Sequence, residues 1–265
     1  MRPEERVPVC LTIAGSDSGG GAGIQADLKA FARCGVHGTC AITAITAQNT
    51  LGVELVTQIP RETIRAQVHA VAEDIGVDAV KVGMLGDEAT IDAVVEALGL
   101  VGDAPAVVDP VMVSASGAVL LDPGAKAALI ERILPLATVA TPNLPEAREL
   151  ASLGDGASPE ELARAIQALG PNAVVVTGGH SDHGADVLFD GSGTLRIDGP
   201  RYPDAASHGS GCTHSSALAA YLARGAEVAE AARRARELAS EAVGNGLAGI
   251  GEGPGPVDAL GIIRR

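Results

Sequence analysis

The chain has 265 residues and a formal net charge of −14, because 33 Asp and Glu residues outnumber 19 Lys and Arg residues. This acidic balance argues against a nucleic-acid-binding protein, since such proteins neutralise phosphates with Lys and Arg. No stretch approaches the roughly 18 uninterrupted apolar residues that a membrane span requires, so no membrane partner is expected. Aromatic residues make up only 2% of the chain, which leaves a core of Ala, Val, Leu and Ile.

The four cysteines, Cys10, Cys34, Cys40 and Cys212, form no C-x-x-C pair. The first residues lead directly into a short apolar strand and do not resemble a secretory leader. We therefore interpret the cysteines as reduced cytosolic thiols and predict a cytoplasmic protein.

Short apolar runs alternate with helical segments along the chain. Several runs are rich in Val and Ile, as strands buried on both faces of a parallel sheet are. The predicted strands are Val7–Ala14, Thr39–Ala47, Leu55–Ile59, Ala79–Val82, Ala106–Asp109, Thr138–Ala140 and Ala173–Thr177. The predicted helices are Ile24–Cys34, Glu62–Asp74, Glu88–Leu98, Pro123–Leu134, Pro145–Leu150, Pro159–Leu169, Thr213–Arg224 and Ala226–Asn245.

Repeated β-α-β units predict an α/β fold with a mainly parallel sheet covered by helices on both faces. Val187–Phe189 and Thr194–Ile197 flank a turn-forming D-G-S-G segment and predict a small hairpin at one end of the sheet. We see no long linker, since Gly154–Ser158 is only a loop. Residues 1–265 are therefore expected to form a single domain.

The segment Ser207–Ser216 reads S-H-G-S-G-C-T-H-S-S and directly precedes a predicted helix. Free N–H groups and the helix dipole make such a junction a ready anion site. Gly209, Ser210 and Gly211 would expose their backbone N–H groups, and Cys212 at a helix N-terminus would ionise more easily than a free thiol. His208 and His214 flank the motif and could tune Cys212 electrostatically. The alternative is a glycine-rich turn that simply caps a surface helix.

Other polar residues follow predicted strands, where parallel sheets bind ligands. The loop Gly15–Gly23 would let its backbone approach a ligand closely. Gln48 carries a donor and an acceptor on one amide and can pair with the edge of an aminopyrimidine, or it can serve a local turn. Met84 would form a soft apolar wall or belong to the core. Asp27 either faces the ligand or complements a helix dipole.

Asp109 ends an apolar strand, and Asn143 and Glu146 lie at the strand-to-helix junction T-P-N-L-P-E. Oxygen ligands of this kind, acting mostly through water, suit Mg²⁺ that carries nucleotide phosphates. The same spacing also predicts a capping box between Asn143 and Glu146. Both interpretations can hold together.

Motifs across nearly the whole chain resemble the hydroxymethylpyrimidine/phosphomethylpyrimidine kinases, the thiamine-synthesis family of the ribokinase-like superfamily. The segments that carry the resemblance are Thr12–Lys29, Ile45–Thr50, Lys81–Leu85, Asp109–Gly117, Thr141–Ala147, Gly178–His180, His208–Thr213 and Gly251–Val257. The resemblance implies a ribokinase-like fold, ATP and Mg²⁺ as cofactors, and a homodimer. It also implies two successive phosphorylations, first of a hydroxymethyl group and then of the resulting monophosphate.

By position, the resemblance assigns each part of the site. The predicted substrate-binding residues are Gln48, Asp27, Met84 and Gly15. The predicted nucleotide- and phosphate-binding residues are Asn143, Thr177, Gly178 and Gly179, and the predicted Mg²⁺ residues are Glu146, Asn143 and Asp109. Gly209, Ser210, Gly211 and Cys212 would form a catalytic anion hole, in which the Cys212 thiolate accepts the proton of the acceptor hydroxyl.

One position departs from the family pattern. Members commonly carry Lys immediately before the G-G-H glycines, whereas this chain carries Thr177. The change removes a point charge from the nucleotide side, and we expect either Mg²⁺ and backbone groups to suffice or another cation, Lys81 or an arginine, to reach in. Two alternatives stay open: a pyridoxal kinase of the same superfamily, and a non-catalytic pyrimidine-binding sensor.

Overall fold

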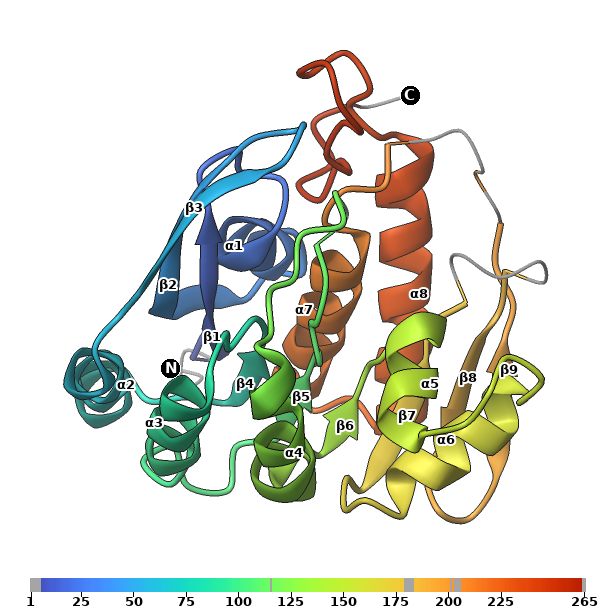
Figure 1. Ribbon diagram of the computed structural model, residues 1–265, viewed down its shortest axis with the longest axis horizontal. Coiled ribbons are helices and arrows are strands. Elements are labelled where there is room, and N and C mark those ends of the chain that lie inside the picture. Colours follow the sequence, from blue (N-terminus) through green and yellow to red (C-terminus); the bar gives the residue numbers. More distant parts are fainter. Residues whose placement is uncertain (1–5, 115, 179–183, 201, 203–205, 264–265) are drawn as a thin grey trace, which may run out of the picture.

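The computed structural model describes residues 6–114, 116–178, 184–200, 202 and 206–263. Its strands form one nine-stranded sheet in the order β3-β2-β1-β4-β5-β6-β7-β8-β9 (Figure 1). The strands are β1 Val9–Asp17, β2 His37–Gln48, β3 Val53–Gln58, β4 Ala79–Val82, β5 Ala106–Val108, β6 Val139–Ala140, β7 Ala173–Val176, β8 Asp186–Phe189 and β9 Thr194–Ile197. The six neighbouring strands β2, β1, β4, β5, β6 and β7 pair in parallel. The antiparallel pairs among the described strands are β2–β3 at one end of the sheet and β7–β8 and β8–β9 at the other.

Helices cover both faces of the sheet (Figure 1). They are α1 Gly23–Arg33, α2 Arg61–Asp74, α3 Glu88–Leu98, α4 Lys126–Ala128, α5 Leu144–Ala151, α6 Pro159–Gln167, α7 Ser210–Ala223 and α8 Val228–Gly244. Helices α1, α7 and α8 pack on one face, and α2 to α6 pack on the other. The expected mainly parallel α/β fold with a peripheral hairpin, β8–β9, is confirmed.

The strands divide their side chains between two cores, as the two-residue period of a strand requires. In β4, for example, Val80 and Val82 face one core, while Ala79 faces the other. Both sets are fully buried, which explains why these strands read as continuous apolar runs in the sequence.

The predicted helix Pro123–Leu134 is irregular. It consists of a 3₁₀ turn η1 (Pro123–Ala125), α4, a π-helical segment η2 (Leu129–Ile133) and a second 3₁₀ turn η3 (Leu134–Leu136). Pro135 has no N–H to donate to the carbonyl of Glu131, so a regular α-helix cannot continue through this point.

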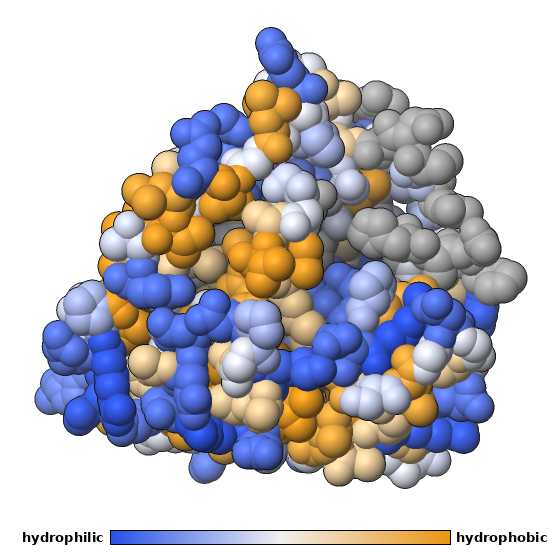
Figure 2. Space-filling model, viewed as in Figure 1, coloured by the Kyte–Doolittle hydropathy of each residue, from blue (hydrophilic) through white to orange (hydrophobic). Residues whose placement is uncertain are grey.

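Two surface features bear on the function of the chain. Among the described residues, no helix is both long and apolar enough to cross a bilayer. Apolar side chains gather over β2 and β3 (upper left in Figure 2), where Ile45, Leu55 and Val56 are exposed. An apolar strip along an antiparallel sheet edge is an exposed surface that partner chains can cover.

The core on the α1, α7 and α8 face depends on one large side chain, Phe31. It is fully buried, and it belongs to the cluster that includes Leu218 and Leu238. We expect Phe31→Ala to lower the free energy of unfolding by about 3–5 kcal/mol, because it removes buried apolar surface and leaves a cavity. Urea unfolding measures the change. Val7→Ala, at a site that is 58% exposed, is the control and should cost about 0.5 kcal/mol or less; equal losses in the two variants would contradict the assignment.

Candidate active site

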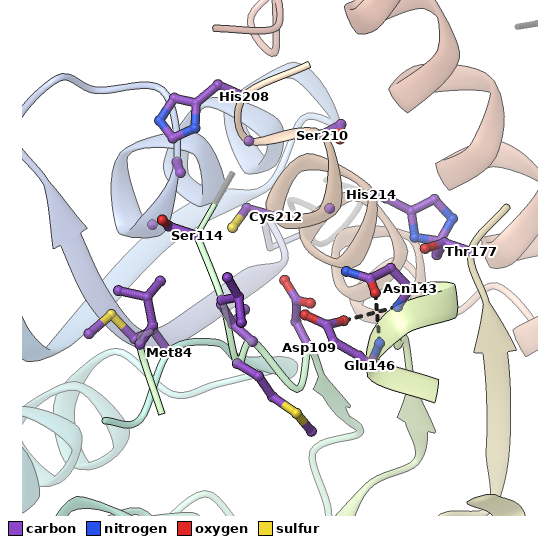
Figure 3. Close-up of a pocket in the computed structure, with 18 of the residues that line it drawn as sticks. Met84, Asp109, Ser114, Asn143, Glu146, Thr177, His208, Ser210, Cys212 and His214 are labelled. Atoms are coloured by element: carbon purple, nitrogen blue, oxygen red, sulfur yellow. Dashed lines mark hydrogen bonds between the residues drawn. The ribbon is translucent and has the colours of Figure 1, made fainter. Parts of the chain in front are cut away.

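A cavity of about 1080 Å³ opens beyond the carboxyl ends of the parallel strands. Figure 3 shows its labelled side chains converging from several loops and from the start of α7. Of the residues expected at the site, those that line the cavity are Gly15, Gln48, Met84, Asp109, Asn143, Glu146, Thr177, Gly209, Ser210, Gly211 and Cys212. Asp27 and Gly178 do not line it, and Gly179 lies outside the described residues.

The glycine-rich turn is positioned by a close contact between two loops. Helix α7 begins at Ser210, three residues earlier than expected, so that Cys212 lies inside its first turn. Gly209 precedes the helix with φ of +82°, and a Cβ there would lie 1.8 Å from the carbonyl oxygen of Gly21. Only glycine allows both the left-handed backbone and this approach. The turn is therefore fixed against the loop that follows β1.

The N–H groups of the turn are not all available to a ligand. The Ser210 N–H donates to the carbonyl of Ser207 at 3.1 Å, and the Thr213 N–H donates to that of Gly209 at 2.9 Å. Within the described part of the chain, the amides of Gly211 and Cys212 donate to no acceptor that closes the turn. The Ser210 N–H is thus removed from the expected donor set, and the N–H groups of Gly211 and Cys212 lie at the positive end of α7.

The expectation that Cys212 ionises easily is wrong. Burial raises the pKa of the Cys212 thiol to about 12, and the nearby carboxylates of Asp109 and Asp27 add to this effect. Lys81 and a hydrogen bond from the Gly23 N–H act in the opposite direction but do not compensate. At neutral pH the thiol is therefore protonated, and it is not a proton acceptor of ordinary strength.

The two histidines beside the motif pair with carboxylates and not with Cys212. His208 Nε2 lies 2.9 Å from Asp17 Oδ2, and His214 Nε2 lies 3.1 Å from Asp186 Oδ2. Figure 3 shows the rings of His208 and His214 on opposite sides of Cys212, both directed away from it. The idea that they tune the thiol is not supported, since neither is a cause of its shifted pKa.

Asp17 is a site residue that the sequence reasoning missed. Its carboxylate accepts hydrogen bonds from the N–H groups of Gly19, Gly21 and Ala22, at 2.8–3.0 Å. Burial alone would raise the pKa of Asp17, but the bond with His208 and the bonds from the N–H groups of Ala22 and Gly19 hold it below its usual value. Asp17 thus fixes the loop after β1 and, through His208, the start of α7. The signal was present in the S-D-S-G-G sequence, because Asp readily accepts from N–H groups two residues on.

Asp27 lies beneath the cavity and does not form part of its wall, which corrects its expected place. The carboxylate is fully buried and accepts from Thr12 Oγ1 and Ser216 Oγ, both at 2.7 Å. Lys81 Nζ lies 3.1 Å from Asp27 Oδ1 and 3.6 Å from Asp109 Oδ2. Lys81, which is also fully buried, therefore forms ion pairs with two carboxylates at the floor of the site.

Asn143 and Glu146 form the expected capping box at the start of α5. The Asn143 N–H donates to Glu146 Oε2, and the Glu146 N–H donates to Asn143 Oδ1, both at 2.9 Å (Figure 3). Burial, reinforced by the charge of Asp109, raises the pKa of Glu146 to about 8. Burial also raises the pKa of Asp109, against the influence of Lys81.

These residues fit a magnesium site that is completed by water and by a ligand. The raised pKa values show that two buried carboxyl groups face the cavity with too little positive charge nearby. Among the described residues, no group of three or more His, Cys, Asp and Glu side chains gathers to hold a metal ion. Mg²⁺ typically takes one or two carboxylates and completes its shell with water and phosphate oxygens, so Asp109, Glu146 and Asn143 suit it.

The opposite end of the cavity is lined by Gly15, Gln48 and Met84. A Cβ at Gly15 would lie 3.0 Å from the sulfur of Met84, so these two residues form one close-packed wall. Thr46 Oγ1 donates to the carbonyl of Ser16 at 2.8 Å and lies 3.3 Å from Gln48 Oε1, so the Gln48 amide is held beside β1 at the cavity wall. The arrangement suits a small, flat, polar-edged ring.

Thr177 connects the β7 end of the cavity to Asn143. The two residues pair in a parallel bridge, and the Thr177 N–H donates to the carbonyl of Pro142 at 2.9 Å. The Gly178 N–H donates to Asp186 Oδ1 at 2.9 Å, and a Cβ at Gly178 would lie 1.8 Å from the carbonyl oxygen of Ala185. The close contact with Ala185 therefore requires glycine at position 178.

The nine-stranded sheet and the cavity beyond its carboxyl ends define a ribokinase-like kinase. Residues 17–258 match the phosphomethylpyrimidine kinase family, and the chain belongs to that family. It is 48% identical over 255 residues to the hydroxymethylpyrimidine/phosphomethylpyrimidine kinase of Rhizobium meliloti (strain 1021), an alignment that covers 94% of this chain and 96% of the relative.

Solved structures show the same likeness. The phosphomethylpyrimidine kinase of Clostridium difficile 630 is 42% identical, with a TM-score of 0.79, and the match covers 90% of this chain and 100% of that one. The pyridoxal kinase of Staphylococcus aureus in complex with AMP-PCP and pyridoxal is 36% identical, with a TM-score of 0.88, and the match covers 97% and 95% of the two chains.

The raised pKa of Glu146 predicts a pH-dependent stability. Between the ordinary carboxyl pKa of 4.5 and the folded value of about 8, the folded state binds more protons than the unfolded state, so stability falls as pH rises through this window. Asp109, whose pKa is also raised, contributes to the same fall. In metal-free protein, Glu146→Gln should therefore reduce the fall and be more stable than the parent at pH 9, by about 1–3 kcal/mol. Urea unfolding from pH 5 to 9 measures it. The exposed Glu131→Gln is the control, and a parental slope in Glu146→Gln would contradict the assignment.

Proposed function

We propose that this protein is an ATP-dependent kinase that phosphorylates 4-amino-5-hydroxymethyl-2-methylpyrimidine and then its monophosphate, in thiamine biosynthesis. The observation that carries the proposal is the continuity of one cavity. It joins a small-ring pocket at Met84 and Gln48 to the N-terminus of α7 and then to the carboxylates of Asp109 and Glu146. The names of the most similar relatives support the choice of substrate.

At the acceptor end, Gln48 reads the edge of the pyrimidine, and Met84 with Gly15 packs against its face. Gln48 has the donor and acceptor that an aminopyrimidine edge requires. Cys212 lies between this pocket and the carboxylates (Figure 3), so the hydroxymethyl group of the bound ring would point toward the start of α7. Asp27 supports this floor from below through Thr12, Ser216 and Lys81.

Phosphoryl transfer requires alignment and charge stabilisation more than covalent chemistry. The N–H groups of Gly211 and Cys212 would donate to the oxygens of the migrating phosphoryl group, and the α7 dipole would act in the same direction. The loose transition state of such reactions needs little early deprotonation of the acceptor. A protonated Cys212 thiol is therefore compatible with turnover, and the reaction does not need this thiol as a general base.

Asp109, Glu146 and Asn143 would hold Mg²⁺, mostly through water, together with the donor phosphates. When bound, the ion neutralises charge on the phosphate oxygens. We still predict that Thr177 and Gly178 contact the nucleotide, because Thr177 lines the cavity next to Asn143.

We further propose that residues 1–265 act as one kinase domain within a cytoplasmic homodimer. The one continuous sheet supports the single domain. The exposed apolar residues Ile45, Leu51, Leu55 and Val56 on and beside β2 and β3 support a surface that a second copy covers.

A pyridoxal kinase is the second candidate function, because the similar Staphylococcus aureus structures include complexes with pyridoxal. A coupled assay of ADP release with hydroxymethylpyrimidine, its monophosphate and pyridoxal tests both candidates. We expect the value of kcat/KM for hydroxymethylpyrimidine to exceed that for pyridoxal at least about tenfold, a difference of about 1.4 kcal/mol in transition-state binding. The reverse order would identify a pyridoxal kinase, and saturable pyrimidine binding without ADP release would identify a sensor.

The protonated state of Cys212 predicts a modest effect of Cys212→Ala. We expect kcat for both acceptors to fall by less than about tenfold, well below the roughly 10²–10⁴-fold typical of a general base. The pH–rate profile should keep its shape, since no group titrating near neutrality is removed. A loss above a hundredfold that is confined to the alcohol acceptor would restore the general-base role. Cys40→Ala, at a half-buried cysteine outside the cavity lining, is the matched control.

A further inference from the structure

A cluster of buried polar groups lies at the end of the cavity that is farthest from Met84. Its members, Asp186 in β8, His214 in α7, and Arg236 and Ser240 in α8, all line the cavity and are almost completely buried. Among the described residues, His214 Nδ1, Arg236 Nε and Ser240 Oγ have no hydrogen-bond partner, whereas Asp186 Oδ2 and His214 Nε2 lie 3.1 Å from each other. Buried polar atoms without partners are costly, and several of them on one cavity wall indicate a ligand or water.

Arg236 is the cation of this cluster, and two acceptors hold its guanidinium group. One terminal nitrogen donates to the carbonyl of Gly184, and the other lies 3.5 Å from Asp186 Oδ1. A guanidinium group has five N–H donors in a fixed plane, so this arrangement leaves further donors. Burial would raise the pKa of Asp186, but His214 and Arg236 hold it below its usual value, so the pair is ionised.

The same carboxylate connects Arg236 to the expected nucleotide side. Asp186 Oδ1 also accepts from the Gly178 N–H at 2.9 Å, and Gly178 follows Thr177, which pairs with Asn143. These contacts fix Arg236 relative to the cavity wall that contains Thr177. Thr177 occupies the position at which members of the family commonly carry a lysine.

The other cations of the cavity are committed elsewhere. Lys81 is held by Asp27 and Asp109 at the floor. Lys126 is partly exposed and pairs with Glu149 at 2.6 Å. Of the arginines in the described residues, Arg236 is the one that lines the cavity. Because charge acts more strongly where water is excluded, a buried guanidinium group is the cation best placed to bind an anion here.

We propose that Arg236, positioned by Asp186, binds the phosphate groups of the donor nucleotide and supplies the positive charge that Thr177 lacks. A guanidinium group suits this role because its fork can donate two hydrogen bonds to one phosphate group. The inference rests on the proposed kinase function and adds the residue that determines affinity for the donor.

Direct binding of ADP, measured by calorimetry with MgCl₂ and without any acceptor, tests the inference separately from turnover. Arg236→Gln should raise the Kd of ADP by roughly ten- to a hundredfold, the range for lost hydrogen bonds to a charged group. Competition by inorganic tripolyphosphate should weaken equally, whereas competition by adenosine should stay within about twofold. Arg234→Gln, on the exposed side of the same helix, should bind ADP like the parent.

A second substitution tests whether charge is the missing element. Adding Thr177→Lys to Arg236→Gln should recover at least about half of the lost affinity on a logarithmic scale, because it returns a cation to the same wall. If Arg236→Gln does not fold, as thermal unfolding would show, Arg236→Lys decides the question. It keeps the charge but loses the fork, so we expect a severalfold rise in the Kd of ADP.

Three results would overturn the inference. The first is an unchanged Kd of ADP in the folded Arg236→Gln or Arg236→Lys variant. The second is an equal loss for adenosine, which would place the nucleoside and not the phosphates at Arg236. The third is a loss of ADP binding in Lys126→Gln that is larger than in Arg236→Gln. A parent that binds ADP but phosphorylates no acceptor would refute the proposed function and leave the Arg236 inference standing.

Discussion

The site depends on a buried lysine held between two carboxylates. Lys81 in β4 has no exposed surface, and it lies within 3.1 Å of Asp27 in α1 and 3.6 Å of Asp109 after β5. A charge in this position would be very unfavourable alone, and it is tolerated only because its partners are close and are themselves hydrogen-bonded. Thr12, Ser215 and Ser216 donate to the two carboxylates, so five elements of the fold meet at one ionic cluster. This cluster forms the floor on which α7 rests.

Upon that floor, a second set of contacts fixes the start of α7. Asp17 fastens the loop after β1 through three N–H groups and holds His208, whose backbone also pairs with the segment around Pro256. The contact between Gly209 and Gly21 leaves no room for a side chain. Donors aimed at a transition state act best when they need not reorganise during the reaction. Three segments that are distant in sequence thus hold two N–H groups in place.

Much of this arrangement could be predicted from the sequence because it is local. Continuous Val- and Ile-rich runs indicated buried parallel strands, and N-L-P-E predicted the capping box that the structure contains. The features that the sequence did not reveal are tertiary. Burial sets the protonation of Cys212, and no pattern around the residue reports how deeply it is buried. Asp27 shares the helical spacing of an exposed N-terminal carboxylate, yet it lies under the cavity. Asp186 and Arg236 are fifty positions apart, and neither belongs to a motif.

The protonated thiol has a consequence for the proposed kinase, which would use one cavity for two acceptors. The first acceptor is a neutral alcohol, and the second is a phosphate that is already ionised near neutral pH. A thiolate beside the acceptor would repel the second one at short range, and burial would strengthen that repulsion. A neutral thiol repels neither acceptor. Because burial raises the pKa of Cys212, the first phosphorylation has no thiolate base, which a loose transition state hardly needs. The same burial allows the charged monophosphate to bind for the second phosphorylation.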